Sequence, residues 1–302
     1  MIPARFGYVR AASLAHAIET LAADEDARAL AGGHSLVPLL KLRFATPSVL
    51  VDLGRLDDLR YIREEDGQIA IGALTTHHQL ATDPLVARRT GLLATVAAEI
   101  GDPQVRHRGT IGGSVAHGDP ASDLPAALLA LEAEYVITGP SSVRVVPASE
   151  FHLGFWQTAL SRGELLTEVR VPAGSGGHAF RKFRVRAMDW AVVGVAAART
   201  PAAIGVALIN MCPTPLRARS VEAALAAGAD PATAASHAAD DTEPPADHAA
   251  SAAFRAHLAR VLTAEVLTEL AGGAGGPGGA GSGAAGSRPA GPALSPDRSQ
   301  ED

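Results

Sequence analysis

The chain has 302 residues, which is enough for two or three domains of ordinary size. Hydrophobic residues make up 47% of the sequence and aromatic residues only 4%, so a large core must be built mostly from aliphatic side chains. The net charge of −6 argues against a nucleic-acid-binding protein, and the lack of any run of about 18 apolar residues argues against a transmembrane helix.

Residues 1–55 are expected to form a small β-α-β unit. Ser13 can cap a helix, because the apolar residues that follow it recur at helical spacing. The pattern then predicts a strand at 28–31, a short helix at 36–41 and a buried strand at 49–53.

Residues 56–172 are expected to form a second unit, which a glycine-rich segment divides into two halves. The first half is predicted to hold a strand at 68–73, a short helix capped by Thr76, a segment opened by Pro84, a helix at 92–100 and a loop at 104–109. The second half is predicted to hold a helix at 124–131, strands at 133–138 and 143–146 joined by a tight turn, and a strand at 165–171.

A third unit is expected at 173–270, because the composition changes at a run of small residues after Ala173. Its order of strands followed by helices is typical of an α+β domain. It is predicted to contain a three-stranded meander at 179–186, 191–199 and 204–211, then helices at 220–227, 231–239 and 254–270. The tail at 271–302 is rich in Gly, Ala and Pro, and we expect it to be disordered.

Cysteine usage limits the redox chemistry that the chain can perform alone. Cys212 is the only cysteine, so the chain can form no internal disulfide and no iron–sulfur cluster ligated by its own cysteines. The first residues lack an apolar signal core, so we expect a cytoplasmic location rather than secretion.

The segment at 110–125 carries the first candidate site. We expect Thr110 and Ile111 to end a strand and the next two residues, Gly112 and Gly113, to form a turn, which without Cβ atoms can take positive φ and let its amides approach a ligand closely. Ser114 adds a hydroxyl, and two acids, Asp119 and Asp123, follow before a helix. Exposed amides beside a helix start favour an anion, although an ordinary glycine turn remains an open alternative.

A second glycine segment, Ala-Gly-Gly-His-Ser at 31–35, lies about 80 residues earlier and is followed by Leu36. One such loop could hold one phosphate, and two could hold a pyrophosphate from both sides. We therefore expect a dinucleotide between two lobes. His34 and His117 lie within these loops, either facing solvent or donating a hydrogen bond to a phosphate or ring.

Other kinds of site fit less well. Asp52 lies at a strand end about 20 residues after Gly32, as a ribose-binding acid would in a nicotinamide site, but the Gly-x-Gly-x-x-Gly pattern is missing. No histidine pairing typical of a metal site occurs, so no metal is expected. Neither Ser35 nor Ser114 lies in Gly-x-Ser-x-Gly, so no serine nucleophile is expected.

The two glycine segments, together with 117–123, closely resemble the FAD-binding medium subunits of molybdenum hydroxylases, nearest in type to that of aerobic carbon monoxide dehydrogenase. The resemblance covers nearly all of residues 1–270. Further matching segments lie at 38–41, 51–54, 71–76, 101–106, 108–109 and 213–217.

The resemblance implies a fold in which two α/β subdomains, 1–55 and 56–172, hold FAD between them in the PCMH-type arrangement. A C-terminal α+β subdomain would cover the flavin. No catalytic acid, base or nucleophile is implied. The cofactor-binding residues that it implies are Ala31, Gly32, Gly33, His34, Ser35, Leu36, Thr110, Ile111, Gly112, Gly113, Ser114, His117, Asp119, Asp123, Lys182 and Trp190.

Two of these residues have open alternatives. Lys182 belongs to a row of basic residues on one predicted strand, which could face solvent, a partner or the flavin. Trp190, which follows Asp189, could stack on the flavin ring or could be a core aromatic. The chain also departs from the family pattern, with Gly118 in place of alanine, a shortened segment at 196–203, and Cys212 at a usually smaller position.

The resemblance also implies a role within a complex. A large subunit would oxidise the substrate at a molybdenum cofactor, and a small subunit would pass the electrons through two 2Fe–2S clusters to FAD in this chain. The acceptor would be a quinone, NAD or oxygen. The complex would be a dimer of heterotrimers in the cytoplasm, which could meet the inner face of the membrane.

Three other functions remain open from the sequence. A self-contained oxidase of the vanillyl-alcohol oxidase type would need a larger capping domain than the roughly 100 residues after Ala173 provide. A cell-wall precursor reductase of the MurB type also holds FAD between α/β lobes. A non-enzymatic FAD-binding or assembly protein is the third alternative.

Overall fold

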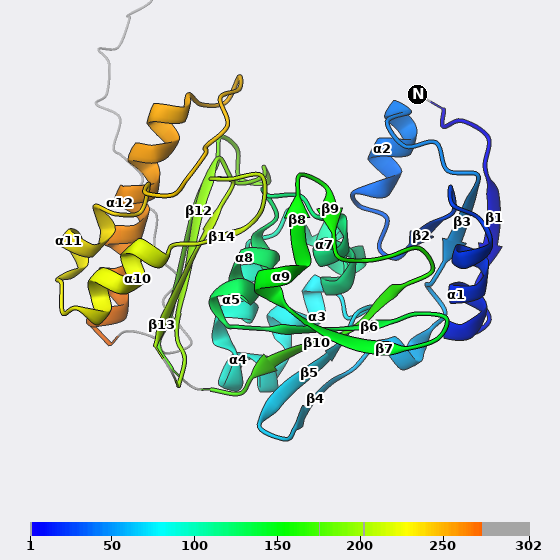
Figure 1. The fold of residues 1–302 in the computed structure, drawn as a ribbon, viewed down its shortest axis with the longest axis horizontal. Coiled ribbons are helices and arrows are strands. Elements are labelled where there is room, and N and C mark those ends of the chain that lie inside the picture. Colours follow the sequence, from blue (N-terminus) through cyan, green and yellow to red (C-terminus); the bar gives the residue numbers. More distant parts are fainter. Residues whose placement is uncertain (1, 175, 202, 274–302) are drawn as a thin grey trace, which may run out of the picture.

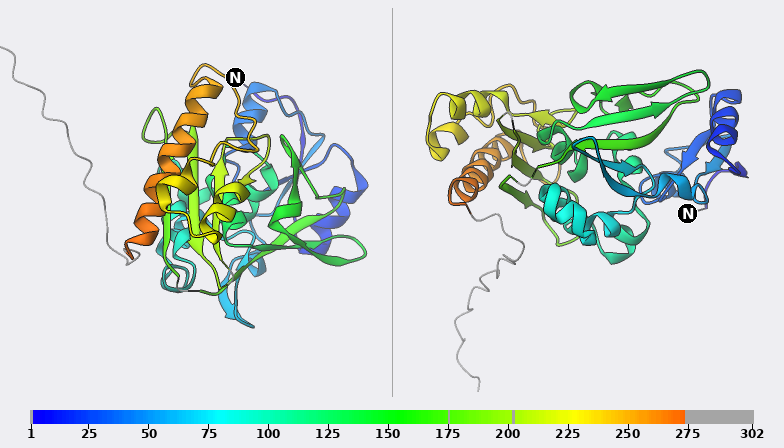
Figure 2. Two further views of the ribbon diagram at one scale, coloured as in Figure 1. Left: turned by 60° about the vertical axis from the view of Figure 1, so that its left-hand side comes forward. Right: turned by 90° about the horizontal axis from the view of Figure 1, so that it is seen from below.

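The computed structural model describes residues 2–174, 176–201 and 203–273, and it has three parts that follow one another along the chain (Figure 1). The N-terminal and C-terminal parts lie at opposite ends of the molecule, with the central part between them (Figure 2). None of the helices in these described ranges combines the length and the apolar character that crossing a membrane requires. The predicted tail lies outside the described residues from position 274 onward.

The N-terminal part is built on a parallel three-stranded sheet in the order β1-β3-β2. Its elements are β1 (Gly7–Arg10), α1 (Leu14–Ala23), β2 (Arg28–Leu30), α2 (Leu36–Leu42) and β3 (Val49–Asp52). Ser13 caps α1 as predicted, since its hydroxyl accepts a hydrogen bond from the amide of His16 at 3.1 Å. The sequence did not predict β1, because its residues are mostly exposed and show no regular apolar alternation.

The central part is a five-stranded antiparallel sheet, in the order β4-β5-β10-β6-β7, covered by short helices. The strands are β4 (Ile62–Glu65), β5 (Gln68–Gly72), β6 (Glu134–Thr138), β7 (Val143–Pro147) and β10 (Leu165–Pro172). The helices are α3 (His77–Thr82), α4 (Pro84–Arg89), α5 (Gly91–Ala98), α6 (Pro103–Arg108), α7 (Ile111–His117), α8 (Asp123–Ala130) and α9 (Ala148–Phe151). A turn of 3-10 helix (Asp57–Leu59) and a small hairpin, β8 (His152–Gly154) with β9 (Gln157–Thr158), complete it.

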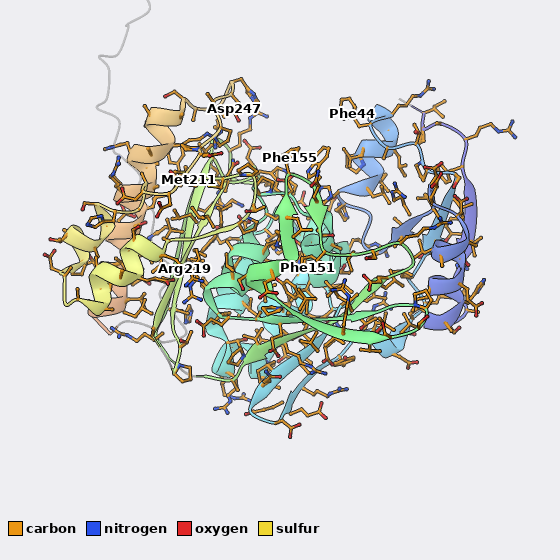
Figure 3. All side chains as sticks on the ribbon, viewed as in Figure 1. Phe44, Phe151, Phe155, Met211, Arg219 and Asp247 are labelled. Carbon is orange, nitrogen blue, oxygen red and sulfur yellow. The ribbon has the colours of Figure 1, made fainter. Side chains whose placement is uncertain are left out.

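Side chains of the central part fill one aliphatic core between the sheet and the helices. Phe151 is fully buried there, whereas Phe44 and Phe155 project from the molecule and are 76% and 55% exposed (Figure 3). Tyr135 packs edge-on against Phe151, with ring centroids 4.8 Å apart. Apart from Phe180, the rest of this core is Ala, Val, Leu and Ile, as the low aromatic content predicts.

Two segments of the central part differ from the prediction. The expected loop at 104–109 belongs mostly to α6, which Asp102 caps by accepting a hydrogen bond from the amide of Val105 at 2.8 Å. The expected strand end and glycine turn at 110–113 are the cap and first turn of α7. Neither Gly112 nor Gly113 has a positive φ.

The C-terminal part is a meander, as predicted, with a short fourth strand added at its edge. Its strands are β11 (His178–Phe183), β12 (Val193–Arg199), β13 (Ile204–Ile209) and β14 (Leu216–Arg217), in that order across the sheet. Its helices are α10 (Arg219–Ala226), α11 (Pro231–Ala235) and α12 (Ala252–Ala271). Despite the shortened segment, β12 and β13 pair in continuous register from Gly194 with Ile209 to Arg199 with Ile204.

Alternation along β12 and β13 divides the side chains between two cores. Val195 and Leu208 face α12, whereas Ala196 and Ala207 face the helices of the central part. The small side chains on the second face allow close packing. At Gly205, a Cβ atom would lie 2.0 Å from the carbonyl oxygen of Ala130, so only glycine fits there.

Candidate functional site

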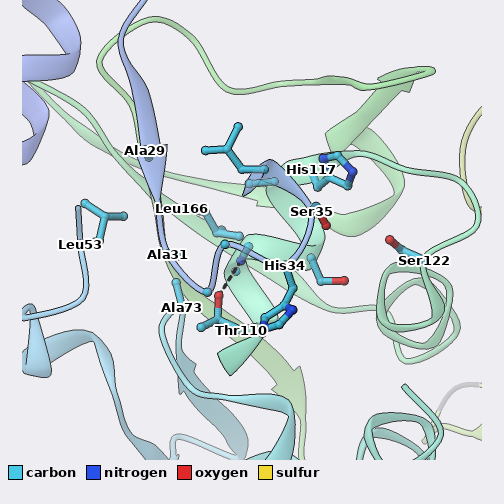
Figure 4. A pocket seen from close by; sticks show the side chains of 18 of the residues that line it. Ala29, Ala31, His34, Ser35, Leu53, Ala73, Thr110, His117, Ser122 and Leu166 are labelled. Carbon is cyan, nitrogen blue, oxygen red and sulfur yellow. Dashed lines mark hydrogen bonds between the residues drawn. The ribbon is translucent and has the colours of Figure 1, made fainter. Parts of the chain in front are cut away.

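A cleft of about 680 Å³ is lined by residues of the N-terminal, central and C-terminal parts. Both glycine segments line it, and Figure 4 shows the loop at 31–35 beside Thr110. A Cβ on Gly113 would lie 3.8 Å from that of Ala31, which confirms that the two segments face one another. The volume lies within the range typical of ligand sites.

Nearly all of the predicted cofactor-binding residues line this cleft. They are Ala31, Gly32, Gly33, His34, Ser35, Leu36, Thr110, Gly112, Gly113, Ser114, His117, Asp123, Lys182 and Trp190. The two exceptions are Ile111, whose side chain is fully buried in the central core, and Asp119, which lies outside the lining. The carboxylate of Asp119 instead accepts a hydrogen bond from the Nε1 of Trp156 at 3.4 Å.

The first glycine segment presents free backbone donors. Gly33 has φ of +77°, which turns the chain sharply between β2 and α2. Within the described part of the chain, the amides of residues 32–36 donate no hydrogen bond to a protein acceptor. Consecutive unpaired N–H groups in such a turn form a concave site for an anion.

Gly32 allows this loop to lie directly against α6. A Cβ at this position would lie 2.2 Å from the carbonyl oxygen of Arg108 and 2.8 Å from the Cα of Gly109. Both neighbours are backbone atoms, so no side-chain rotation could relieve the overlap. Gly32 is therefore required for the approach of the two lobes.

The second glycine segment does not offer the free amides that we expected. The amides of Ile111 and Gly112 donate to the carbonyl oxygens of Thr75 and Ala73 at 3.0 and 2.9 Å. The Oγ1 of Thr110 accepts a hydrogen bond from the amide of Gly113 at 3.1 Å. The carbonyl oxygen of Thr110 accepts one from the amide of residue 114 at 3.0 Å. The prediction that both glycine segments offer free amides is thus wrong for the second segment. That segment instead forms a wall close to the first one and contributes the hydroxyl of its serine.

Asp123 and Lys182 form a buried ion pair in the wall of the cleft. The Nζ of Lys182 lies 2.7 Å from the Oδ2 of Asp123, and the two side chains are only 4% and 6% exposed. Burial raises the pKa of the Asp123 carboxyl, and the neighbouring ammonium opposes that shift. The Oδ1 of Asp123 is buried and has no partner among the described residues, so it is an available acceptor.

His77 also lines the cleft, although the sequence suggested only a structural or surface role. It is 5% exposed, and burial lowers its pKa to about 4, so the ring is neutral near pH 7. Its Nδ1 has no partner within the described ranges. A Cβ on Gly109 would lie 2.7 Å from the imidazole, so that glycine makes room for the ring.

Trp190 is not a core residue, which decides one of the alternatives left open by the sequence. It is 52% exposed and lines the cleft with Met188, which is 61% exposed. Both side chains precede β12 and belong to the C-terminal part. An indole in this position can shield or stack on a planar ligand.

Several lining residues were not predicted, chiefly those at 160–164 between β9 and β10, the first two residues of β10, and Leu21, Glu25 and Arg28 in the N-terminal part. Gly163 has φ of +75°, which is the only local sign of a shaped loop there. Asp52, considered above as a ribose-binding acid, does not line the cleft. Its carboxylate accepts hydrogen bonds from the Tyr8 hydroxyl and, at 2.8 Å, the amide of residue 54.

No group of three or more metal-binding side chains occurs within the ranges that the structure covers. What the cleft combines is free backbone donors at one end and a buried charge pair beside an exposed indole at the other. That combination suits a long ligand with an anionic middle and a planar end.

Comparison with known families gives two matches along the chain. The family described as the FAD binding domain in molybdopterin dehydrogenase matches residues 4–174. The family described as the CO dehydrogenase flavoprotein C-terminal domain matches residues 178–270. Together they span the three parts of the structure.

Individual relatives agree with these matches. The carbon monoxide dehydrogenase medium chain of Hydrogenophaga pseudoflava is 42% identical over 266 residues, covering 82% of this chain and 93% of the relative. The glyceraldehyde dehydrogenase medium chain of Sulfolobus acidocaldarius is 36% identical over 281 residues, covering 90% and 100%. The solved structure of a Hydrogenophaga pseudoflava carbon monoxide dehydrogenase that lacks the Mo-pyranopterin moiety superposes with a TM-score of 0.87 and 42% identity, covering 90% of this chain and 99% of that one.

Proposed function

This chain belongs to the family of FAD-binding medium subunits of the molybdenum hydroxylases, and from that premise we propose that it carries electrons from 2Fe–2S clusters of a partner subunit through FAD to an external acceptor. It is an oxidoreductase subunit that acts within a complex, and FAD is its cofactor. Bound FAD would supply the reversible redox chemistry, and the protein would bind and orient it.

The single observation that supports this proposal most strongly is the row of free amides at 32–36 on a cleft of about 680 Å³. In the proposed complex these amides donate to the diphosphate of FAD. Hydrogen bonds to a charged acceptor contribute about 1.5–3 kcal/mol each. Across the cleft, the hydroxyl of Ser114 adds a side-chain donor, and Gly113 beside it places no side chain in the path of the diphosphate.

We assign the flavin ring to the other end of the cleft, where the ion pair lies. Asp123 has an unpartnered, buried Oδ1 that can accept a hydrogen bond from the ring, and Lys182 places a positive charge beside it. A fixed positive charge there would stabilise negative charge that develops on a reduced ring. Trp190 would cover one face of the ring and limit its exposure to water.

The partners follow from the same proposal. The chain has one cysteine, so the clusters that feed FAD must belong to another subunit. Oxidation of the organic or inorganic substrate would occur at a molybdenum cofactor in a large subunit. The proposal includes a dimer of heterotrimers in the cytoplasm, with a quinone, NAD or oxygen as the acceptor.

Reconstitution and partner capture test the proposal directly. The full chain should bind one FAD, lose its yellow colour with dithionite, and regain it with an acceptor. It should co-purify with subunits that contain iron, acid-labile sulfide and molybdenum. A chain that stays free of flavin after reconstitution would contradict the cofactor assignment, and rapid turnover of an added substrate by the flavin-loaded chain alone would favour a self-contained oxidase.

A further inference from the structure

Asn210 follows the last residue of β13 and has φ of +60°, in the left-handed region that non-glycine residues rarely adopt. Asparagine tolerates this region because its short amide can bond to nearby backbone. The residue is half-buried and does not line the cleft. A backbone of this kind persists only where surrounding contacts hold it.

Three hydrogen bonds from Asn210 join two separate segments. Its backbone N–H donates to the carbonyl oxygen of Pro120 at 2.9 Å. Its side-chain Nδ2 donates to the carbonyl oxygens of Ala191 and Val192, at 2.8 and 3.4 Å. One residue thus connects the loop before α8 with the two residues that precede β12.

Both connected segments carry residues of the cleft wall. Asp123 lies three positions after Pro120, and Trp190 immediately precedes Ala191. The position of the indole relative to the buried ion pair therefore depends on contacts made behind the wall. Asn210 supplies such contacts to both sides.

The segment that precedes β12 is also held from the side of α12. The guanidinium of Arg255, only 1% exposed, donates to the carbonyl oxygen of Val192. The same side chain is paired with Asp247 at 2.7 Å. Because Arg255 of α12 fixes the carbonyl of Val192, the side-chain amide of Asn210 donates to a segment that is already held in place.

We propose that Asn210 is a positioning residue that sets the place of Trp190 relative to Asp123 and Lys182 at the flavin end of the cleft. That the ligand at this end is a flavin rests on the proposed function. The contacts of Asn210 themselves are observed in the chain without cofactor. Loss of the amide should loosen this end of the cleft and leave the amides at 32–36 unchanged.

Two substitutions separate the amide from the backbone. Asn210→Gly keeps the left-handed backbone and its N–H and removes only the side-chain bonds. Asn210→Asp keeps the size and places an oxygen against two carbonyls. Both substitutions are introduced into a parent chain that carries Trp156→Phe, so that Trp190 is the only tryptophan of the full chain.

The first measurement uses the chain without FAD. Loss of a hydrogen bond worth about 1 kcal/mol should raise the population with a displaced Trp190 about fivefold. This appears as stronger acrylamide quenching and a red-shifted emission. In the FAD-loaded chain, the visible circular dichroism of the flavin and its midpoint potential should change, while affinity for oxidised FAD should stay within about threefold of the unsubstituted chain, because the diphosphate donors are intact.

Ser251→Ala is the matched control. It removes the hydroxyl that caps α12, which accepts a hydrogen bond from the amide of Phe254 at 3.2 Å, and so weakens the same part of the molecule. It should leave the Trp190 and flavin signals unchanged. Equal changes in this control and in Asn210→Gly would overturn the positioning role, as would unchanged signals in both Asn210 variants.

The outcomes also distinguish this inference from the proposed function. A parent chain that takes up no FAD would contradict the proposed function. If Trp190 in that chain still responds to Asn210→Gly as expected, the geometric inference holds without it. A parent chain that binds FAD, with variants that respond in neither measurement, would overturn the inference alone.

Discussion

Gly32→Ala tests whether the close approach of two lobes creates the cofactor site. The new Cβ would lie 2.2 Å from the carbonyl oxygen of Arg108 and 2.8 Å from the Cα of Gly109. A carbon and an oxygen in contact lie at about 3.3 Å, so the loop at 31–35 must move by about 1 Å. Its free amides would move with it, away from the wall formed by α7.

The expected effect follows from that displacement. Overpacking of this kind costs about 1–3 kcal/mol of unfolding free energy. If two charge-assisted hydrogen bonds to the diphosphate each weaken by about 1.4 kcal/mol, the dissociation constant for FAD rises about 100-fold. The loss of affinity should therefore exceed what the loss of stability alone produces at a temperature where the chain is folded.

Titration of the FAD-free chain, followed by flavin fluorescence, measures this effect. Gly67→Ala is the control, because Gly67 has φ of +74° in the β4–β5 turn and no atom lies within 4 Å of the added Cβ. It should cost about 1–2 kcal/mol of stability and leave FAD affinity unchanged. A Gly32→Ala chain that binds FAD within about threefold of this control would refute the reasoning.

Three further predictions concern buried titratable side chains. The pKa of His77, at about 4, lies below its ordinary value, so the unfolded chain takes up the proton first as the pH falls. Stability present above pH 6.5 is then lost down to pH 4, by about 2 kcal/mol at pH 5. His77→Gln should flatten this part of a series of urea-unfolding measurements, and an equally steep loss in that variant would contradict the argument from burial. Lys182→Met should lower the free energy of unfolding by about 3–5 kcal/mol, because it leaves a buried carboxylate unpaired. Adding Asp123→Asn should restore most of that stability, and no recovery in the double variant would show that the two side chains are not coupled. Arg255→Met should lower the unfolding free energy by about 2–4 kcal/mol in the same assay, and an unchanged midpoint would contradict the structural role given to its buried guanidinium.

The sequence predicted the elements whose apolar residues recur regularly over many positions. The helix at 254–270, the strand at 165–171 and the meander all lie close to their predicted places. The sequence also predicted that the two glycine segments lie at one site, because small residues are typical of places where chain and ligand approach closely. Both segments do line the cleft. The family matches agree with the resemblance on which the FAD assignment was based.

The sequence could not show what each glycine is for. Gly112 and Gly113 were interpreted as a turn, but the cap formed by Thr110 begins a helix there. A Cβ on Gly112 would lie 2.5 Å from that of Ala73, so this glycine serves the packing of α7 against a distant segment. Such a contact depends on tertiary structure and has no local signal.

The lining residues at 160–164 were missed for a different reason. They belong to the connection between β9 and β10 and show neither helical nor alternating apolar periodicity, so nothing marked them as part of a site. His77 was missed because a single histidine carries no sign of its burial. Its depth results from the glycine at 109, which is separated from it by more than 30 residues of chain.

The face of β12 and β13 that carries Ala196 and Ala207 completes the interior of the central part. A gene cut near residue 174 would therefore divide a shared interior, although it falls between two family matches. Each fragment would expose an apolar surface and would tend to aggregate. Heating the intact chain should accordingly give one cooperative transition for residues 56–270, and separately expressed halves should fold only when they are produced together.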